Sequence, residues 1–263
     1  MIIIKIGGGN GINLRGIIED LSGLNETYVI VHGANALRDQ LAENLGQPKQ
    51  ILTSVKGYAS VYSDDKLLDV MMMAYAGLRN KRIVEMCHQH GINALGLTGL
   101  DGKMVQGKRN KGIRVYQGGK LKIVRDYSGK PQTINTSLLQ ILLDNGYIPV
   151  LTVPIIDEQN AAINTENDDV VRVLQQSLQA DTVINLIEAP GFLENKNDEN
   201  SLINRISSSE LETREQQVEG RMKRKILAVR KLFEHGASKV IISDGRAEHP
   251  IADAMAGKGT VIT

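Results

Sequence analysis

The sequence is poor in residues on which several protein classes depend. Its one cysteine, Cys87, excludes an intramolecular disulfide and a cysteine-based metal cluster. It has no tryptophan and two phenylalanines, which leaves few aromatic side chains for stacking on nucleic-acid bases. No apolar run approaches the roughly 20 residues of a membrane-spanning helix, and the N-terminus does not resemble a secretory signal. These absences favour a cytoplasmic globular protein that binds neither nucleic acid nor membranes.

A surplus of charge of one sign is also missing. The 263 residues include 31 Lys plus Arg and 30 Asp plus Glu, for a formal net charge of +1. Such a balance provides no overall attraction to nucleic acid or to an anionic membrane. A partner bound by charge must therefore be recognised by a local patch.

Short β-branched runs recur along the chain, with helical patterns between them. Most runs lack strict alternation, which is typical of strands buried on both faces. Apolar residues at Leu37, Leu41 and Leu45 indicate one helix, and Asp64 is a suitable N-cap for the next. We predict an α/β fold, a three-layer sandwich with a mainly parallel central sheet. The predicted strands are 1–6, 27–32, 92–98, 147–153, 182–187, 239–244 and 260–263.

Residues 101–130 break this alternation. Short alternating runs separated by glycine-containing turns predict an antiparallel hairpin that projects from the sheet. The segment contains nine Lys or Arg and two Asp. Two interpretations are open: charges that protect a sheet edge from aggregation, or a docking surface for an acidic partner.

Two predicted strands end in glycine turns. The first is followed by Gly7, Gly8 and Gly9, and the second by Gly33. Glycine turns that lead into a helix can bind an anion through backbone amides, but they can also serve close packing alone. Neither GxxxxGK[ST] nor GxGxxG is present. Lys5 can point into the crevice at this edge of a parallel sheet, or its ammonium can extend to water.

Two later segments concentrate polar side chains at predicted helix starts. The segment AAINTENDDVVRVL contains a dense acidic and amide group, part of which can simply complement the helix dipole. The segment EGRMKRKIL places four cations where that dipole opposes them, which suggests that they meet an anion. The residues are Asn164, Glu166, Asn167, Asp168 and Asp169 in the first segment, and Arg221, Lys223, Arg224 and Lys225 in the second.

Together these motifs resemble the amino acid kinase family, and in length and layout its acetylglutamate kinase branch. The match runs in order over essentially the whole chain: Lys5-x-Gly7-Gly8, His32-Gly33, Asn164-x-Glu166-x-Asp168, Pro190-Gly191 and Gly220-x-Met222-x-x-Lys225. The resemblance implies a single domain, 1–263, in which residues 1–180 mainly bind substrate and residues 181–263 mainly bind nucleotide.

Three positions depart from the acetylglutamate kinase pattern. Ala34 and Asn35 replace glycines, Glu166 replaces an asparagine, and GYASVYSD lacks the arginine that would bind the substrate's α-carboxylate. These changes resemble the kinases of carrier-dependent lysine synthesis, which act on aminoadipate held through its α-amino group by a small acidic amino-group carrier protein. Carrier-linked glutamate, for arginine synthesis, is a second implied substrate. The hairpin would then dock the carrier through Lys108, Arg109, Lys111 and Arg114.

The resemblance implies ATP and Mg²⁺ as cofactors and transfer of the γ-phosphoryl group to a side-chain carboxylate. Lys5 and Lys225 would stabilise the transferring group, and Asp168 would hold both ammonium groups. Mg²⁺ would be carried by ATP phosphates and water, without a metal site made by the protein alone. The implied nucleotide neighbours are Gly7, Gly8, Gly9, Glu188, Gly191, Phe192, Leu193, Met222 and Lys223, and the implied substrate neighbours are Gly33, Ala34, Asn35, Tyr58, Ser60, Tyr62, Asn164 and Glu166.

Two rival functions remain open. One is phosphorylation of free N-acetylglutamate, against which the missing arginine argues. The other is a non-catalytic nucleotide-binding subunit, against which Lys5, Asp168 and Lys225 argue together. The apolar helix around Met71, Met72 and Met73 is typical either of a deeply buried helix or of a dimer interface, and the resemblance implies a homodimer through this region. Because the chain starts on its first strand, we expect no arginine feedback.

Overall fold

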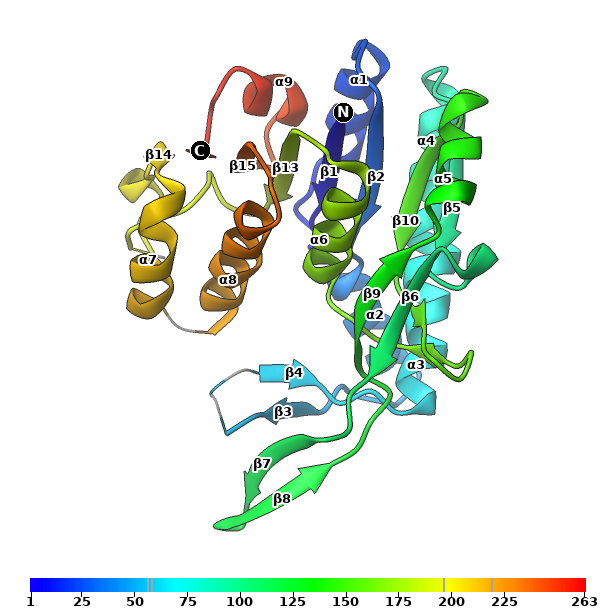
Figure 1. Ribbon diagram of the computed structural model, residues 1–263, viewed down its shortest axis with the longest axis vertical. Coiled ribbons are helices and arrows are strands. Elements are labelled where there is room, and N and C mark those ends of the chain that lie inside the picture. The colour runs from blue at the N-terminus through cyan, green and yellow to red at the C-terminus, as the bar shows by residue number, and fades with distance from the viewer. Residues whose placement is uncertain (56, 58, 196, 219) are drawn as a thin grey trace.

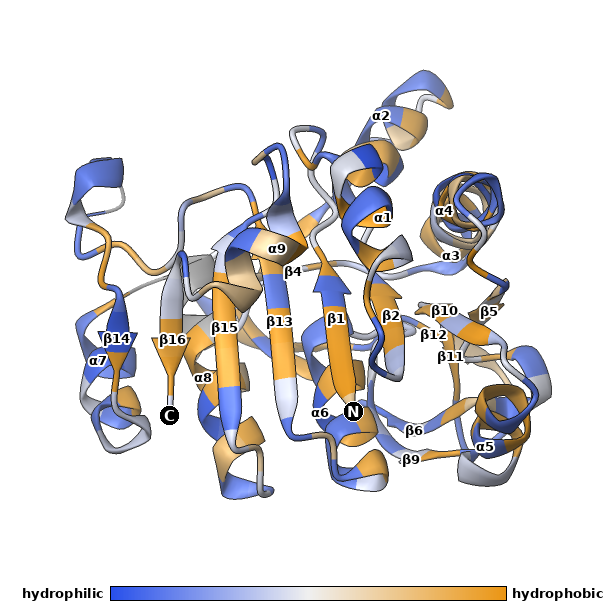
Figure 2. Ribbon diagram, turned by 90° about the horizontal axis from the view of Figure 1, so that it is seen from above, coloured by the Kyte–Doolittle hydropathy of each residue, from blue (hydrophilic) through white to orange (hydrophobic). Residues whose placement is uncertain are grey.

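The computed structural model describes residues 1–55, 57, 59–195, 197–218 and 220–263, with the side chains of residues 220–225 outside the description. Its central sheet has eight strands in the order β14-β16-β15-β13-β1-β2-β10-β5 (Figures 1 and 2). Neighbouring strands are parallel except for β15 and β16, which confirms the predicted mainly parallel sheet. The strands are β1 (Ile2–Ile6), β2 (Tyr28–His32), β5 (Ala94–Thr98), β10 (Ile148–Thr152), β13 (Thr182–Ile187), β14 (Arg205–Ile206), β15 (Lys239–Asp244) and β16 (Thr260–Ile262).

Helices cover both faces of the sheet and complete the predicted three layers (Figure 2). Because side chains alternate along a strand, Ile2, Ile4 and Ile6 of β1 enter one core, whereas Ile3 enters the other. Lys5 shares the face of Ile3. The first core includes α1 (Leu14–Ser22), α4 (Asn80–Gln89) and α9 (Pro250–Met255), and the second includes α2 (Asn35–Asn44), α5 (Thr136–Asp144), α6 (Asn167–Leu178), α7 (Leu211–Gln217) and α8 (Gly220–Glu234).

The segment 101–130 is more than the single projecting hairpin that we predicted. Its outer parts, β6 (Val105–Arg109) and β9 (Gly129–Ile134), pair within a separate four-stranded sheet with β11 (Ile155–Ile156) and β12 (Ala162–Ile163). Only β7 (Ile113–Gln117) and β8 (Lys120–Val124) form the projecting hairpin (Figure 1). The hairpin of β3 (Ile51–Thr53) and β4 (Ala59–Val61) lies beside it, since Val55 N donates to Arg114 O at 2.9 Å.

A long helical segment follows β4. It consists of α3 (Asp65–Met71), the π-helical η1 (Met72–Arg79) and α4. The Asp64 side chain accepts a hydrogen bond from Leu67 N at 2.9 Å, which confirms the predicted N-cap. Met71 is buried in the core, whereas Met73 and Leu78 are exposed. Short 3₁₀ turns occur at η2 (Asp101–Lys103), η3 (Glu199–Ser201) and η4 (Ser208–Glu210), and in the described ranges no helix has the length and apolarity to cross a membrane.

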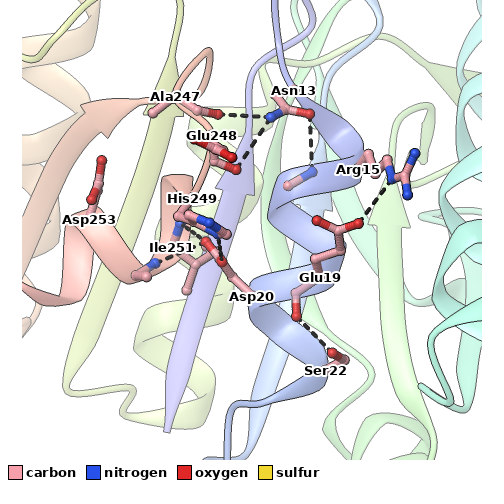
Figure 3. Close-up of polar contacts among 12 residues, drawn as sticks. Asn13, Arg15, Glu19, Asp20, Ser22, Ala247, Glu248, His249, Ile251 and Asp253 are labelled. Carbon is pink, nitrogen blue, oxygen red and sulfur yellow. Dashed lines mark hydrogen bonds and ion pairs between the residues drawn. The ribbon is translucent and has the colours of Figure 1, made fainter.

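Polar contacts tie the last part of the chain to α1, the helix that follows the first glycine turn (Figure 3). Asn13 donates from its backbone to Gly245 O at 2.7 Å and from its side chain to Ala247 O at 2.8 Å. The Asp20 carboxylate accepts a hydrogen bond from Ile251 N at 2.9 Å. Residues distant in sequence therefore hold both ends of α1, and with it the exit of the glycine turn.

His32, at the end of β2, is fully buried in its neutral form. Nδ1 lies 3.3 Å from Gly33 O and Nε2 lies 3.1 Å from the Asn80 side-chain amide, so Nδ1 donates and Nε2 accepts. The pKa of His32 is lowered from 6.5 to about 3, mainly by burial and also by the positive charges of Arg79 and Lys81, while the hydrogen bond to Gly33 O opposes this shift.

We therefore predict that His32 makes folding sensitive to mild acid. Below pH 6.5 the unfolded chain protonates this ring while the folded protein does not, so the free energy of unfolding falls with pH until about 3. When the pH is lowered from 7 to 5.5, the free energy of unfolding of the native protein should fall by about 1 kcal/mol more than that of a His32→Gln variant, as measured by urea denaturation. Equal losses in the two proteins would contradict the assignment of a neutral buried ring.

Candidate active site

The two glycine turns meet at the carboxyl edge of the sheet. Gly33 N donates to Ile6 O at 2.9 Å, and Ala36 N donates to Gly8 O at 3.0 Å. A Cβ atom on Gly8 would lie 2.6 Å from Asn35 N, closer than any side chain allows. The two turns are therefore in direct contact, and this contact requires glycine at position 8 because backbone atoms of Gly33, Ala34 and Asn35 occupy the place of a side chain.

Lys5 forms an ion pair with Asp168 beside these turns. Their Nζ and Oδ1 atoms are 3.0 Å apart, and Lys5 is 8% exposed, so its ammonium does not extend to water. Asp168 lies in the first turn of α6, where the helix dipole also stabilises its negative charge. A buried cation held by a carboxylate at a strand end is suited to stabilise negative charge on a bound group.

Asn185 is a polar residue at this site that sequence reasoning missed. It lies on β13 directly opposite Lys5 of β1, and both line a cavity of about 20 Å³ together with Asp168. Its Oδ1 atom is buried and has no hydrogen-bond partner among the described residues. A cavity of this size holds about one water molecule, which would satisfy that oxygen. The signal was present in the sequence as the one polar residue in the interior of the apolar run TVINLI.

Glu188 lies against the first glycine turn. Its Oε1 accepts a hydrogen bond from Gly11 N at 2.6 Å, and a Cβ on Gly9 would lie 1.8 Å from its Oε2. The turn therefore already binds negatively charged oxygen, which is the property that a phosphate requires. Of the other predicted nucleotide neighbours, Gly191, Phe192 and Leu193 are buried. Phe192 N donates to Thr260 Oγ1 at 2.8 Å, and Leu193 pairs with Leu202.

The predicted substrate residues come from three elements. The Asn35 side chain, at the start of α2, accepts a short hydrogen bond from the hydroxyl of buried Tyr75. Asn164 donates from its side chain to Ser63 Oγ at 2.9 Å, and Glu166 is the exposed N-cap residue of α6. Ser60 and Tyr62 are partly buried in and just after β4, away from the main sheet, and Ala34 is buried beside Gly33. Tyr58 lies outside the described residues, as do the side chains of Met222, Lys223 and Lys225.

The four predicted docking residues differ in their surroundings. Lys108, Lys111 and Arg114 are exposed. Arg109 is partly buried: its guanidinium lies 3.9 Å from the centre of the Tyr127 ring, and its Nε donates to Asp126 O at 3.0 Å. These contacts fasten the base of the hairpin.

In the part of the chain that the structure describes, no group of three or more His, Cys, Asp or Glu side chains is arranged to hold a metal ion. The site consists of the buried Lys5 ammonium group, the Asp168 carboxylate paired with it, and a glycine turn whose Gly11 amide donates to the Glu188 carboxylate.

Comparisons with known proteins agree with this architecture. The profile described as "Amino acid kinase family" matches residues 1–244. The LysW-aminoadipate kinase of Thermus thermophilus is 38% identical over 268 residues, covering 100% of both chains. The LysW-aminoadipate/LysW-glutamate kinase of Saccharolobus solfataricus is 32% identical, covering 100% of this chain and 99% of that protein.

Solved structures show the same fold at lower identity. N-acetylglutamate synthase from Neisseria gonorrhoeae, complexed with coenzyme A and N-acetyl-glutamate, has a TM-score of 0.80 at 20% identity and covers 100% of this chain and 59% of its own. The isopentenyl phosphate kinase of T. acidophilum has a TM-score of 0.65 at 16% identity, with 100% of both chains covered.

The contact between the glycine turns predicts that two glycine-to-alanine variants differ in their affinity for ATP. Gly8→Ala should abolish measurable ATP binding by isothermal titration, because its Cβ would force the turns apart. Gly23→Ala is the control, since the nearest atom to its Cβ would be Asp20 O at 3.7 Å. Wild-type affinity for ATP in Gly8→Ala would show that nucleotide binding does not depend on this contact.

Proposed function

The chain belongs to the amino acid kinase family, and from this we propose a specific reaction for it. The protein is a phosphotransferase that uses ATP. We propose that it phosphorylates the side-chain carboxylate of 2-aminoadipate, and also of glutamate, while each is linked to a small acidic amino-group carrier protein. The product is an acyl phosphate of lysine or arginine biosynthesis. The observation that carries the proposal is the buried Lys5–Asp168 pair beside two joined glycine turns.

The proposed reaction needs no general base, because a carboxylate is already nucleophilic at neutral pH. Catalysis then depends on alignment of the reacting groups and on stabilisation of the transferring phosphoryl charge. Bound ATP supplies the phosphoryl group, and Mg²⁺ arrives with its phosphates. Lys5 and Lys225 supply positive charge, amides of Gly8 and of Ala34 in the Gly33–Ala34 turn donate hydrogen bonds, and Asp168 holds the lysines without accepting a proton.

The choice of a carrier-linked substrate has two supports. First, the segment from Gly57 to Asp64 contains no arginine, so a free amino-acid substrate would lack a bidentate partner for its α-carboxylate there. Second, the exposed cations Lys108, Lys111 and Arg114 lie on or beside the projecting hairpin. A hairpin of this charge can steer an acidic carrier and contribute the binding energy that the missing arginine would supply.

We also infer a homodimer formed through the long helical segment. Met73 and Leu78 expose apolar side chains on η1, and Leu95 of β5 is partly exposed near them at the edge of the sheet. A stripe of this kind is suited to pairing with a second copy. Light scattering should then give about twice the 28.8 kDa mass of one chain.

The proposed substrate can be tested directly. Carrier-linked aminoadipate, carrier-linked glutamate and free N-acetylglutamate should be compared by ATP turnover and hydroxylamine trapping of the acyl phosphate, and activity should be confined to the linked substrates. Lys5→Met should lower turnover at least 100-fold, because loss of one such donor removes about 3 kcal/mol of transition-state stabilisation. Lys239→Met is the matched control, because Lys239 lies at the amino end of β15 and therefore at the edge of the sheet opposite to the site. Preference for free N-acetylglutamate would refute the carrier assignment.

The hairpin makes a second prediction. Combined Lys111→Glu and Arg114→Glu substitutions should raise KM for the carrier-linked substrate at least tenfold, because they repel an acidic carrier, while KM for ATP stays unchanged. The wild-type KM should also rise with salt concentration. Lys103→Glu, exposed in η2 outside the hairpin, should have little effect. If KM for the carrier-linked substrate changes neither with the charge reversal nor with salt concentration, the hairpin has no docking role.

A further inference from the structure

Asn164 is held by a chain of hydrogen bonds that begins at the base of the hairpin. Its side-chain NH₂ group donates to Ser63 Oγ at 2.9 Å, and its backbone N donates to Tyr127 O at 2.7 Å. Ser63 is fully buried, although it belongs to the segment between β4 and α3. Asn164 itself lies four residues before Asp168, the partner of Lys5. The residue therefore connects the hairpin base to the candidate active site.

Asp126 fixes Ser63 in turn. This buried carboxylate accepts hydrogen bonds from Ser63 N at 3.2 Å, Ser128 N at 3.1 Å and Ser128 Oγ at 2.5 Å. Tyr127 N donates to Ser63 O at 2.7 Å, so two adjacent residues hold the Ser63 backbone from both sides. The Asp126–Tyr127 turn is clamped by Arg109, which stacks on the Tyr127 ring and donates to Asp126 O.

The direction of these bonds decides which end of the Asn164 amide is bound to Ser63. The Ser63 hydroxyl donates its hydrogen to Val61 O at 3.2 Å, so towards Asn164 it can only accept. The NH₂ group of Asn164 must therefore turn towards Ser63. What remains on the other side of the amide is its carbonyl oxygen, a pure acceptor.

We propose that Asp126 and Ser63 are positioning residues that hold the Asn164 carbonyl oxygen as the acceptor for an amide N–H of the bound substrate. This inference rests on the proposed function, in which the α-amino group of the amino acid is joined to its carrier through an amide. A substrate with a free α-ammonium group or without this N–H would lose the hydrogen bond. We call Asp126, Ser63 and Asn164 the relay. The relay selects for the acylated amino group, which lies at a distance from the carboxylate that is phosphorylated.

A double-mutant cycle in the full-length protein tests the relay. Ser63→Ala and Asn164→Ala should each lower kcat/KM for the linked substrate about tenfold without changing KM for ATP. The double variant should be no worse than Asn164→Ala, because Ser63 acts only through that amide. Ser63→Cys, which keeps the volume but is a weak acceptor, replaces Ser63→Ala if thermal melting shows that the latter is unfolded. Additive losses would overturn the relay.

A linkage analogue tests the hydrogen bond itself. Replacing the linkage N–H by an ester oxygen should lower kcat/KM of the wild-type protein about tenfold and leave that of Asn164→Ala unchanged. Ser22→Ala is the control variant, because the Ser22 hydroxyl donates to Glu19 O on α1. It should prefer the amide linkage over the ester by the same factor as the wild-type protein. Equal use of both linkages by the wild type would refute the acceptor role.

The relay and the proposed function fail in different ways. If the protein prefers free N-acetylglutamate, the carrier assignment fails, but the cycle can still be measured because that substrate also carries an amide on its α-amino group. If the linked substrates are phosphorylated and the cycle is additive, the relay alone is wrong.

Discussion

The ion pair between Lys5 and Asp168 is the constraint around which the structure is arranged. A buried ammonium group is unfavourable unless a charge of opposite sign lies next to it, and Asp168 supplies that charge to Lys5. Lys5 lies within β1 and Asp168 in the first turn of α6, so the pair is made only when the sheet and its covering helix are both in place. Folding and assembly of the site are therefore the same event.

The parallel order of the sheet places the other components around this pair. Strands β1 and β2 end at the same edge, and the turns that follow them approach so closely that only glycine fits at Gly8. Glu188, at the end of the adjacent β13, fills the space beside Gly9. The site is thus made of backbone amides and a few charges on rigid elements, which suits a reaction that depends on alignment and electrostatics.

The projecting hairpin and its surroundings have two structurally distinct parts. Its tip carries exposed Tyr116 and Leu121, and exposed Arg114 lies nearer the base, so that both parts offer side chains suited to contacting another molecule. Its base, clamped by Arg109 and Asp126, continues through Ser63 to Asn164. A partner bound at the tip and a substrate bound at the sheet edge would therefore share one rigid support, and the two would be held in a set relative position.

Local sequence was sufficient for seven of the eight strands of the main sheet, for the helices between them and for the two glycine turns, because apolar periodicity and glycine punctuation act over a few residues. It did not predict β14, the β3–β4 hairpin or the separate four-stranded sheet. The ordered motifs also identified the family and the candidates Lys5 and Asp168. Tertiary structure alone decided that Asn185 faces Lys5, that Arg109 supports the hairpin base and that Ser63 orients Asn164. Each of these contacts joins residues far apart in the chain, and their partners depend on strand order and register, which no short window of sequence contains.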